Sequence, residues 1–500
     1  MTQTLENNLG FSKNPFSKRS SEQELDFINE IFYEPNYYDT LKRDLISGDT
    51  SFIIGQRGHG KTSVINKLYD DLNKIPKVFI FKVDRFEDIP IDDNEKSFLL
   101  LLIKQLVHNL VVTLVAKKDA VKRLSAYQKD DLAFFVTAFF RPISNSEYVD
   151  AYDKIKKVKW KNRLSVFFNK YGIHIANVLA SGFVEITSDM ARKSLGLNGP
   201  SGDQCKEYFS KIDVFTPTKD PLAENKCTID ELKKILDKIY NIYNTLGYER
   251  VIVLFDKIDE YKNLNHDISI IANFARSILS DTELLMNERL AIGFSLWSEL
   301  KSELSGYVRF DKFGTIDVRW IDEDMIPLID KRLRYFSVDK GSPVKFSSLI
   351  KYATDQQEII ELANKSPRDL IYILSEILKE QANRRSDVTE LDDKAIRKGM
   401  IAFCKEYDYS SLIPTKAGKN KDIKSTINKL LSMRHVRFTQ QKLEDGLNLQ
   451  DHQALGYIRQ MVNFGFIREE EILSESGKKI YEIIDPKIAF MIKHQVGMIE

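Results

Sequence analysis

Short apolar runs alternate with helix-like segments along most of this chain. Five of the runs are rich in β-branched or aromatic residues, at 52–54, 77–84, 251–255, 289–296 and 314–320. Short runs of this kind, separated by segments with helical spacing, are typical of buried strands in a parallel sheet that helices cover. The pattern therefore predicts an α/β fold built on a five-stranded parallel sheet.

The most apolar stretch starts at Phe98 and is long enough to raise the question of a membrane span. It contains Lys104, Gln105, His108 and Asn109. Polar residues at this frequency favour a buried helix of a globular core over a membrane helix. The first ten residues lack the basic and apolar regions of a signal peptide. We therefore expect no membrane partner.

The composition predicts a globular protein of several domains. The 500 residues are 43% hydrophobic and 29% charged, which is more chain than one hydrophobic core accommodates. A net charge of +1 argues against a chain-wide polyanion binder but leaves local basic patches open. Cys205, Cys227 and Cys404 lie far apart with no CxxC spacing. We therefore expect neither a disulfide framework nor a zinc site, and a cytoplasmic location.

Residues 55–62, with the sequence GQRGHGKT, fit the pattern G-x-x-x-x-G-K-[ST]. A predicted strand precedes them and a predicted helix at 63–72 follows, which is the context in which such a loop holds phosphates. Glycines let several backbone N–H groups face the phosphates, the lysine reaches the β- and γ-phosphates, and the threonine holds Mg²⁺. We therefore expect ATP and Mg²⁺ to be bound by Gly55, Gln56, Arg57, Gly58, His59, Gly60, Lys61, Thr62 and Ser63. The alternative is an ordinary glycine-rich turn.

A second acidic motif follows the apolar run 251–255. Asp256 stands at the carboxyl end of this predicted strand, where parallel sheets place their ligands. We expect Asp256 to hold Mg²⁺ together with Thr62, and Asp259 or Glu260 to orient or deprotonate the attacking water. The alternative is a core strand followed by an acidic helix cap.

Together these residues resemble the AAA+/STAND class of P-loop ATPases. The resemblance implies an ASCE/AAA+-like sheet with a helical insertion and a helical lid. It also implies a polar sensor on the fourth strand, where Ser295 stands, and a sensor arginine at the start of a lid helix, where Pro367 precedes Arg368. Proline at a helix start fits this arrangement. The alternatives are a small buried hydroxyl at Ser295 and a surface pair of Arg368 with Asp369.

Two further parts of the chain resemble parts of this class. The segment before the glycine-rich loop resembles the one that packs around adenine, which makes Asn14, Pro15, Phe16, Tyr37 and Tyr38 candidates for that role, although aromatic residues here also suit plain packing. In AAA+ modules an arginine before the fifth strand completes the site of the next subunit. Arg309 stands at that place and implies a homo-oligomer, unless it simply pairs with Asp311.

A long insertion separates the two motifs. It runs from about residue 118 to 228 and is mostly helical in pattern. Within it, basic residues surround Trp160 between Lys154 and Arg163, a composition that suits phosphate contacts and base stacking. The alternative is a solvated helix face.

The C-terminal part resembles a winged helix. A basic stretch at 414–438 reads as a linker, followed by helices at 439–447 and 449–467 and a strand that runs into a last helix or edge at 478–492. In initiator ATPases such a module reads DNA, and in STAND proteins it packs and regulates. Arg459 is the one cation that the expected recognition helix could direct at bases, and a single cation is weak support for reading of the major groove. The linker lysines could still contact phosphates: Lys416, Lys419, Lys421, Lys424 and Lys429.

The expected domains are an N-terminal segment with the first part of the ATPase domain (1–117), the insertion (118–228), the second part of the ATPase domain (229–320), the lid (321–410) and a winged-helix-like domain (411–500). The expected function is a slowly hydrolysing ATPase switch that controls assembly or a partner effector protein, with phage defence as its setting. The sequence contains no nuclease, protease or TIR-like motif, so an effector activity would belong to the partner. The alternative is a DNA-binding ATPase of the initiator or transposition-regulator type.

Overall fold

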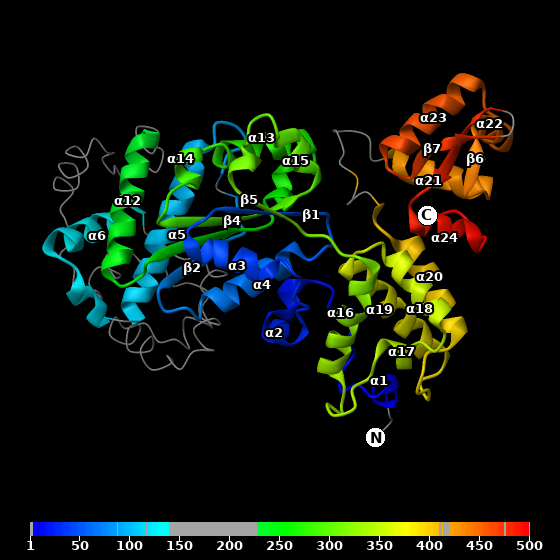
Figure 1. Cartoon of the computed structure of the whole chain (residues 1–500), viewed down its shortest axis with the longest axis horizontal. Helices are drawn as coiled ribbons and strands as arrows, with labels where there is room; N and C mark the ends of the chain where they lie inside the picture. Colours follow the sequence, from blue (N-terminus) through cyan, green and yellow to red (C-terminus); the bar gives the residue numbers. More distant parts are fainter. Residues whose placement is uncertain are drawn as a thin grey trace, which may run out of the picture.

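A computed structural model describes residues 4–87, 89–116, 118–139, 228–409, 413, 421–474 and 477–499 (Figure 1). Most of the insertion lies outside the described residues, and with it the predicted basic cluster Lys154–Arg163. Lys416 and Lys419 also lie outside them.

A five-stranded parallel sheet forms the centre of the first half of the molecule. Its strands are β1 (Ser51–Gly55), β2 (Val78–Val83), β3 (Arg250–Phe255), β4 (Leu290–Trp297) and β5 (Gly314–Asp317). Their spatial order is β2-β3-β4-β1-β5, and every neighbouring pair is parallel. All five predicted strands are therefore confirmed, and only β5 ends earlier than expected.

Helices bury both faces of this sheet (Figure 1). Helices α3 (Tyr38–Ser47) and α4 (Lys61–Leu72) share one apolar cluster with the strands. Helices α5 (Glu95–Ala116), α12 (Ile229–Thr245) and α13 (Ile268–Leu279) share another cluster on the opposite face. Successive strand residues point to opposite faces, so Ile252 joins the first cluster and Val253 the second. Burial on both faces explains why the strands read as continuous apolar runs.

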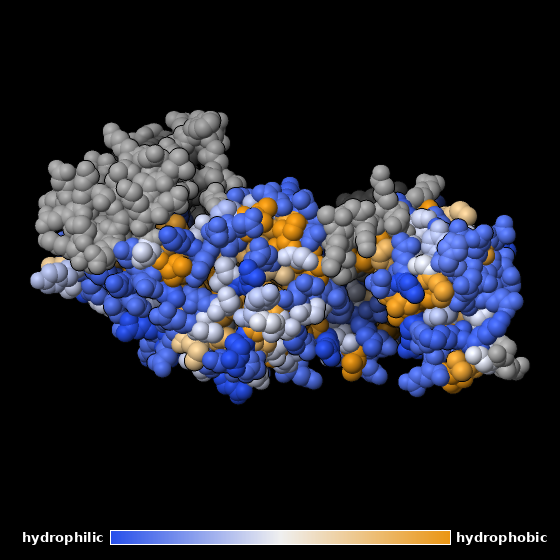
Figure 2. Space-filling model, turned by 90° about the horizontal axis from the view of Figure 1, so that it is seen from above, coloured by the Kyte–Doolittle hydropathy of each residue, from blue (hydrophilic) through white to orange (hydrophobic). Residues whose placement is uncertain are grey.

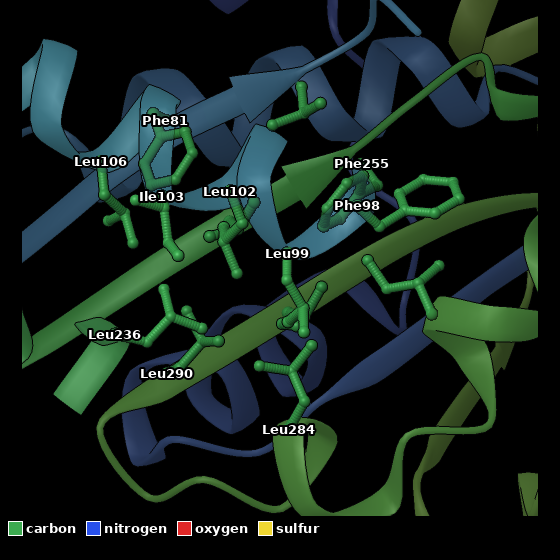
Figure 3. Packing of buried hydrophobic residues seen from close by; sticks show 14 of the residues in the cluster. Phe81, Phe98, Leu99, Leu102, Ile103, Leu106, Leu236, Phe255, Leu284 and Leu290 are labelled. Atoms are coloured by element: carbon green, nitrogen blue, oxygen red, sulfur yellow. The ribbon is translucent and has the colours of Figure 1, made fainter. Parts of the chain in front are cut away.

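Helix α5 lies in the core, as its polar residues predicted. Figure 3 shows Leu99, Leu102 and Ile103 of this helix packed beside Phe81 of the sheet and Leu236 of α12. Among the described residues one segment, Glu95–Leu114, is long and apolar enough to cross a membrane by length and composition, and 56% of its most apolar window is buried. The described start of the insertion, α6 (Ala126–Phe139), is helical as expected.

The segment predicted as the lid is helical, and we keep that name for it. Its helices are α16 (Asp322–Phe336), α17 (Phe346–Leu349), α18 (Ala353–Ala363), α19 (Pro367–Arg384) and α20 (Asp393–Glu406). The N-terminal segment packs into their core through Phe11, Phe16 and Phe27. It contains α1 (Leu5–Asn8), the 3-10 helix η1 (Ser21–Phe27) and α2 (Ile28–Ile31). The buried Arg332 of α16 fixes this segment, because its Nε donates to the Pro15 carbonyl (2.6 Å) and its Nη2 to Glu24 Oε1 (2.5 Å).

The C-terminal unit (residues 421–499) packs on the lid rather than on the sheet (Figure 1), through contacts of α24 with α18 and α20. Its elements follow the order α21 (Lys421–Met433), β6 (Arg437–Thr439), α22 (Gln440–Leu447), α23 (Asp451–Asn463), β7 (Ile467–Leu473), β8 (Lys479–Ile483) and α24 (Pro486–Lys493). The strands form an antiparallel sheet in the order β6-β8-β7.

The predicted linker at 414–438 is wrong over most of its described part, because α21 and β6 occupy it. The apolar residues Ile423, Ile427 and Leu430 lie at helical spacing and are buried. Burial of this stripe outweighs the lysines that gave the segment its linker-like composition. The second predicted helix is also shorter than expected, since Ile467 begins β7.

The closest helix pair of the lid allows a test of its packing. A Cβ at Gly399 of α20 would stand 2.5 Å from the Ile377 Cα of α19, so Gly399→Ala must push the helices apart. We expect an overpacking loss of about 1–3 kcal/mol, measured as a lower urea midpoint of unfolding.

The matched control is Gly456→Ala in helix α23. A Cβ at Gly456 would meet nothing within 4 Å, so the better helix propensity of alanine should raise stability by about 1 kcal/mol. Equal effects of the two substitutions would contradict the close approach of α19 and α20.

Candidate functional site

The glycine-rich loop (residues 55–62) connects β1 to α4 at the carboxyl end of the sheet. Gly58 and Gly60 have φ values of +86° and +88°, a region that favours glycine. Lys61 turns back over the loop, and its Nζ donates to the carbonyls of Gly55 (2.9 Å) and Gln56 (3.1 Å). Burial lowers the pKa of Lys61, while the charges of nearby carboxylates oppose that shift. The loop thus holds a partly buried cation against two of its own backbone carbonyls.

Asp256 directly follows β3, is 1% exposed and faces this loop. Its Oδ1 lies 3.4 Å from the Thr62 hydroxyl, and its Oδ2 is buried without a hydrogen-bond partner among the described residues. Burial raises the pKa of Asp256, and the hydroxyls of Ser295 and Thr62 and the charge of Lys82 lower it. A buried carboxylate oxygen of this kind calls for a cation.

These oxygens suit Mg²⁺. The described residues contain no group of three or more His, Cys, Asp or Glu side chains placed to hold a metal. Mg²⁺ does not need such a cage, because it is usually bound by one or two protein oxygens, with water and substrate phosphates completing its shell. Thr62 and Asp256 are the residues that would hold it, and Ser295 of β4 lies beside Asp256. The predicted residues Thr62, Asp256 and Ser295 are therefore brought together.

Asp259 and Glu260 form the end of η4 (Ile258–Glu260), just after Asp256. Asp259 is buried and forms an ion pair with Arg57 of the loop, with Nη2 and Oδ2 3.4 Å apart. Glu260 lies on the exposed side of the turn. Partial withdrawal from water and the neighbouring Asp259 charge raise the pKa of Glu260, whereas Lys257 and Arg368 lower it. Of the two predicted carboxylates, Glu260 is thus the one that the loop leaves unpaired.

Several residues that the sequence did not single out hold the loop in place. Gln56 Nε2 donates to Glu299 Oε1 (2.9 Å), and the indole N–H of Trp297 lies 3.4 Å from Gln56 Oε1. The Trp320 indole N–H donates to the His59 carbonyl (2.8 Å). Trp297 is the last residue of β4 and Glu299 follows two residues later. Their place at the carboxyl edge of a parallel sheet is the signal that could have identified them.

The lid reaches the loop at Gly58. The backbone N–H of Arg368 donates to the Gly58 carbonyl (3.3 Å), and a Cβ at Gly58 would stand 2.6 Å from Ser366 Oγ. The backbone of Arg368 therefore lies against the loop, and the sensor role of its side chain stays a prediction. Its neighbour Asp369 is turned away from the site, because the Tyr407 hydroxyl donates to Asp369 Oδ2 (2.9 Å).

Arg309 is not brought to the loop of its own chain. It forms an exposed two-point ion pair with Asp311, with Nε–Oδ1 and Nη2–Oδ2 distances of 2.9 and 2.7 Å. This is the alternative arrangement that the sequence allowed. A role in the site of a neighbouring copy stays a prediction.

Most of the adenine candidates pack internally. Phe16 and Tyr38 are buried, and the Tyr38 hydroxyl donates to Asp71 Oδ2 (3.0 Å). The Asn14 side chain accepts from the Phe16 N–H (2.8 Å). Tyr37 differs, because its hydroxyl is buried without a hydrogen-bond partner among the described residues.

The C-terminal unit shows paired charges on its strands. Arg437 pairs with Glu470, Arg468 with Glu482, and Lys479 with Glu469. Helix α23 instead presents exposed polar residues, including Gln453 and Arg459. On the face of the molecule seen in Figure 2, hydrophilic residues predominate and hydrophobic patches are small and separate.

No family model and no curated protein matches this chain. Solved structures similar to it include the Orc1 protein of Aeropyrum pernix in complex with DNA (9% identity, TM-score 0.36, covering 96% of this chain and 97% of that one) and Cdc6p from Pyrobaculum aerophilum (11%, 0.33, 93% and 96%). Drosophila ORC bound to DNA is a third (10%, 0.28, 98% and 90%). Identities and TM-scores this low carry no conclusion about function.

The buried carboxylate of Asp256 predicts how the stability of the protein depends on pH. Because burial raises its pKa above the ordinary value of 3.8, its contribution favours folding at low pH and is lost as pH rises through the raised value. Asp256→Asn should therefore make the ligand-free protein more stable to urea at pH 7.

The same substitution should abolish stabilisation by Mg²⁺ with ATP, which for the unsubstituted protein is about 2.7 kcal/mol at a ligand concentration one hundred times Kd. Asp311→Asn, with an exposed carboxylate, is the control and should change neither quantity much. The prediction would be contradicted if ligand-free Asp256→Asn were less stable than the unsubstituted protein and were still fully stabilised by Mg²⁺ with ATP.

Proposed function

We propose that this protein is a P-loop ATPase that binds ATP with Mg²⁺ and acts as a nucleotide-controlled switch. The observation that carries the proposal is the buried carboxylate of Asp256 at the end of the glycine-rich loop. Its Oδ1 lies beside the Thr62 hydroxyl, and its Oδ2 has no hydrogen-bond partner among the described residues. Lys61 and the loop N–H groups would bind the phosphates, and Thr62 and Asp256 would hold Mg²⁺. When bound, the metal would neutralise charge on the phosphates.

Hydrolysis in this proposal is slow and uses Glu260 as the general base. The residue directly after Asp256 is Lys257, which has a positive φ of 60° and pairs with Glu22 of the N-terminal segment. The nearest unpaired carboxylate is therefore Glu260. Its raised pKa makes the ionised Glu260 carboxylate a stronger base than an ordinary one.

The switch function rests on a chain of contacts from the loop to the C-terminal unit. The first turn of helix α19 contacts the loop at Gly58, where the Arg368 N–H donates to the Gly58 carbonyl. Asp369 of the same helix accepts a hydrogen bond from the hydroxyl of Tyr407, just after α20. The ammonium of Lys487 in α24 lies 4.4 Å from the centre of the Tyr407 ring and is 1% exposed. The Lys487 charge also lowers the pKa of Asp369, against the larger effect of burial. A change at the loop thus reaches the C-terminal unit through buried polar groups.

We further propose the five domains predicted from the sequence, with a winged helix at the C-terminus. Its element order, two helices beside an antiparallel β7–β8 hairpin, supports that assignment. An oligomer with Arg309 in trans and control of a partner effector protein remain predictions, and so does a role in phage defence.

Association with DNA is the second candidate. Its support in this chain is the exposed polar face of α23 with Gln453 and Arg459. The ion-paired cations of the wing strands weigh against tight backbone contacts.

Glu260→Gln tests the proposed base. We expect ATP affinity in calorimetry to persist and phosphate release to fall by about 10²–10⁴-fold. In the unsubstituted protein the rate should rise with pH through the raised pKa of Glu260 and then level off, and this dependence should disappear in Glu260→Gln. Lys61→Ala is the contrasting variant, because it should abolish ATP binding itself. Unchanged hydrolysis in Glu260→Gln would show that another group acts as base.

A gel-shift titration with short duplex DNA across a salt series tests the second candidate. Binding by phosphate contacts should weaken steeply as salt rises, and Arg459→Ala should weaken it further at each salt concentration. Arg385→Ala, which removes an exposed arginine of the lid, is the matched control. Absence of a shift at low salt, with and without ATP, would rule out this role.

A further inference from the structure

Arg57 occupies the third position of the glycine-rich loop, and its side chain is held inside the site. Its side chain is 10% exposed, although an arginine in a turn ordinarily extends its charged end into water. The guanidinium lies over the Trp297 ring, with Cζ 4.5 Å from the ring centre. Its Nη2 also lies 3.4 Å from both the carboxylate and the carbonyl of Asp259. Trp297 and Asp259 therefore form a specific binding place for the Arg57 guanidinium.

The Arg57 side chain belongs to a cluster of charges. Arg57, Lys61 and Arg368 lie near the carboxylates of Asp256, Asp259 and Glu260. Lys82 and Lys257 add positive charge near Asp256, and Lys257 also lies near Glu260. The cations also repel each other, since the Arg57 charge lowers the pKa of Lys61. A nucleotide polyphosphate adds negative charge to this cluster and competes with the carboxylates for the cations. We expect the weakest of the existing cation–carboxylate contacts to break first.

The contact between Arg57 and Asp259 has the geometry of a weak ion pair. Both contacts are 3.4 Å long and use a single nitrogen, whereas guanidinium binds a phosphate through two parallel N–H groups at shorter distances. The Trp297 ring, itself 1% exposed, offers a flat surface along which the guanidinium can turn. Asp259 and Glu260 also mark the side of the loop where the proposed water attack occurs, which is the side of the terminal phosphate.

We propose that Arg57 discriminates nucleoside triphosphate from diphosphate by leaving Asp259 for the terminal phosphate. This inference rests on the proposed function. In the resting protein Arg57 neutralises Asp259, and the exchange releases the Asp259 carboxylate beside Glu260. A cation that stabilises charge on the terminal phosphate then comes from the same chain.

The fluorescence of Trp297 gives a readout that is independent of hydrolysis. We would titrate the full chain with Mg²⁺ and either ADP or a non-hydrolysable ATP analogue, and subtract the response of Trp297→Phe to isolate this indole. Movement of the guanidinium over the ring should change the Trp297 emission with the analogue and leave it unchanged with ADP. Equal responses to both nucleotides would overturn the inference.

Affinity provides the second readout. Arg57→Ala should lower the preference for the analogue over ADP by about tenfold or more, the value of a charge-assisted hydrogen bond. Arg57→Lys keeps the charge but lacks the planar fork, so it should recover only part of the preference and guards against misfolding of the alanine variant. Arg385→Ala is the matched arginine control and should keep the full preference.

The outcomes distinguish the role of Arg57 from the proposed function. An unchanged preference in Arg57→Ala and Arg57→Lys, with both nucleotides still bound, would overturn the role of Arg57 alone. Failure of the unsubstituted protein to bind either nucleotide would overturn the proposed function and this inference with it.

Discussion

At Gly58 the backbone of the glycine-rich loop and the first turn of the lid helix α19 come so close that no side chain fits between them. A Cβ there would stand 2.6 Å from Ser366 Oγ, and the Arg368 N–H donates to the Gly58 carbonyl. This contact sets where Arg368 enters the site. It also orients α19 so that the next residue, Asp369, points into the buried contacts with Tyr407 and the C-terminal unit. A rearrangement of the loop cannot leave the lid where it is.

Burial of charge is the second constraint, and it explains why this site needs a ligand. The folded protein keeps Asp256 nearly inaccessible, and one of its oxygens has no hydrogen-bond partner in the part of the chain that the structure describes. This arrangement costs stability unless a cation compensates it. Lys61 meanwhile satisfies its ammonium with loop carbonyls. Both groups are held ready for partners of opposite charge, which ATP and Mg²⁺ would supply in the proposed function. The stability given up in the ligand-free protein is thus the source of binding energy.

The sheet and the loop could be predicted from the sequence because they depend on local signals. Strands buried on both faces read as apolar runs, and the loop pattern is set by glycines that the backbone requires at φ values near +87°. The places of Ser295 and Arg368 followed from the resemblance. Contacts between distant segments could not be predicted: nothing local links Arg57 to Asp259, Gln56 to Glu299, or Lys257 to Glu22. Helix α21 was missed because its lysines dominated the composition, although Ile423 and Ile427 carried a helical stripe.

The central claim is that the nucleotide site and the C-terminal unit are linked through α19. Hydrogen–deuterium exchange of the full chain with and without Mg²⁺ and ATP tests it most directly, because exchange reports the local opening of each segment. The account predicts slower exchange in the loop, in the first turns of α19, around Tyr407 and in α24, and no change in α24 when Lys61→Ala is used. Protection confined to the loop and the residues after β3 would contradict the link.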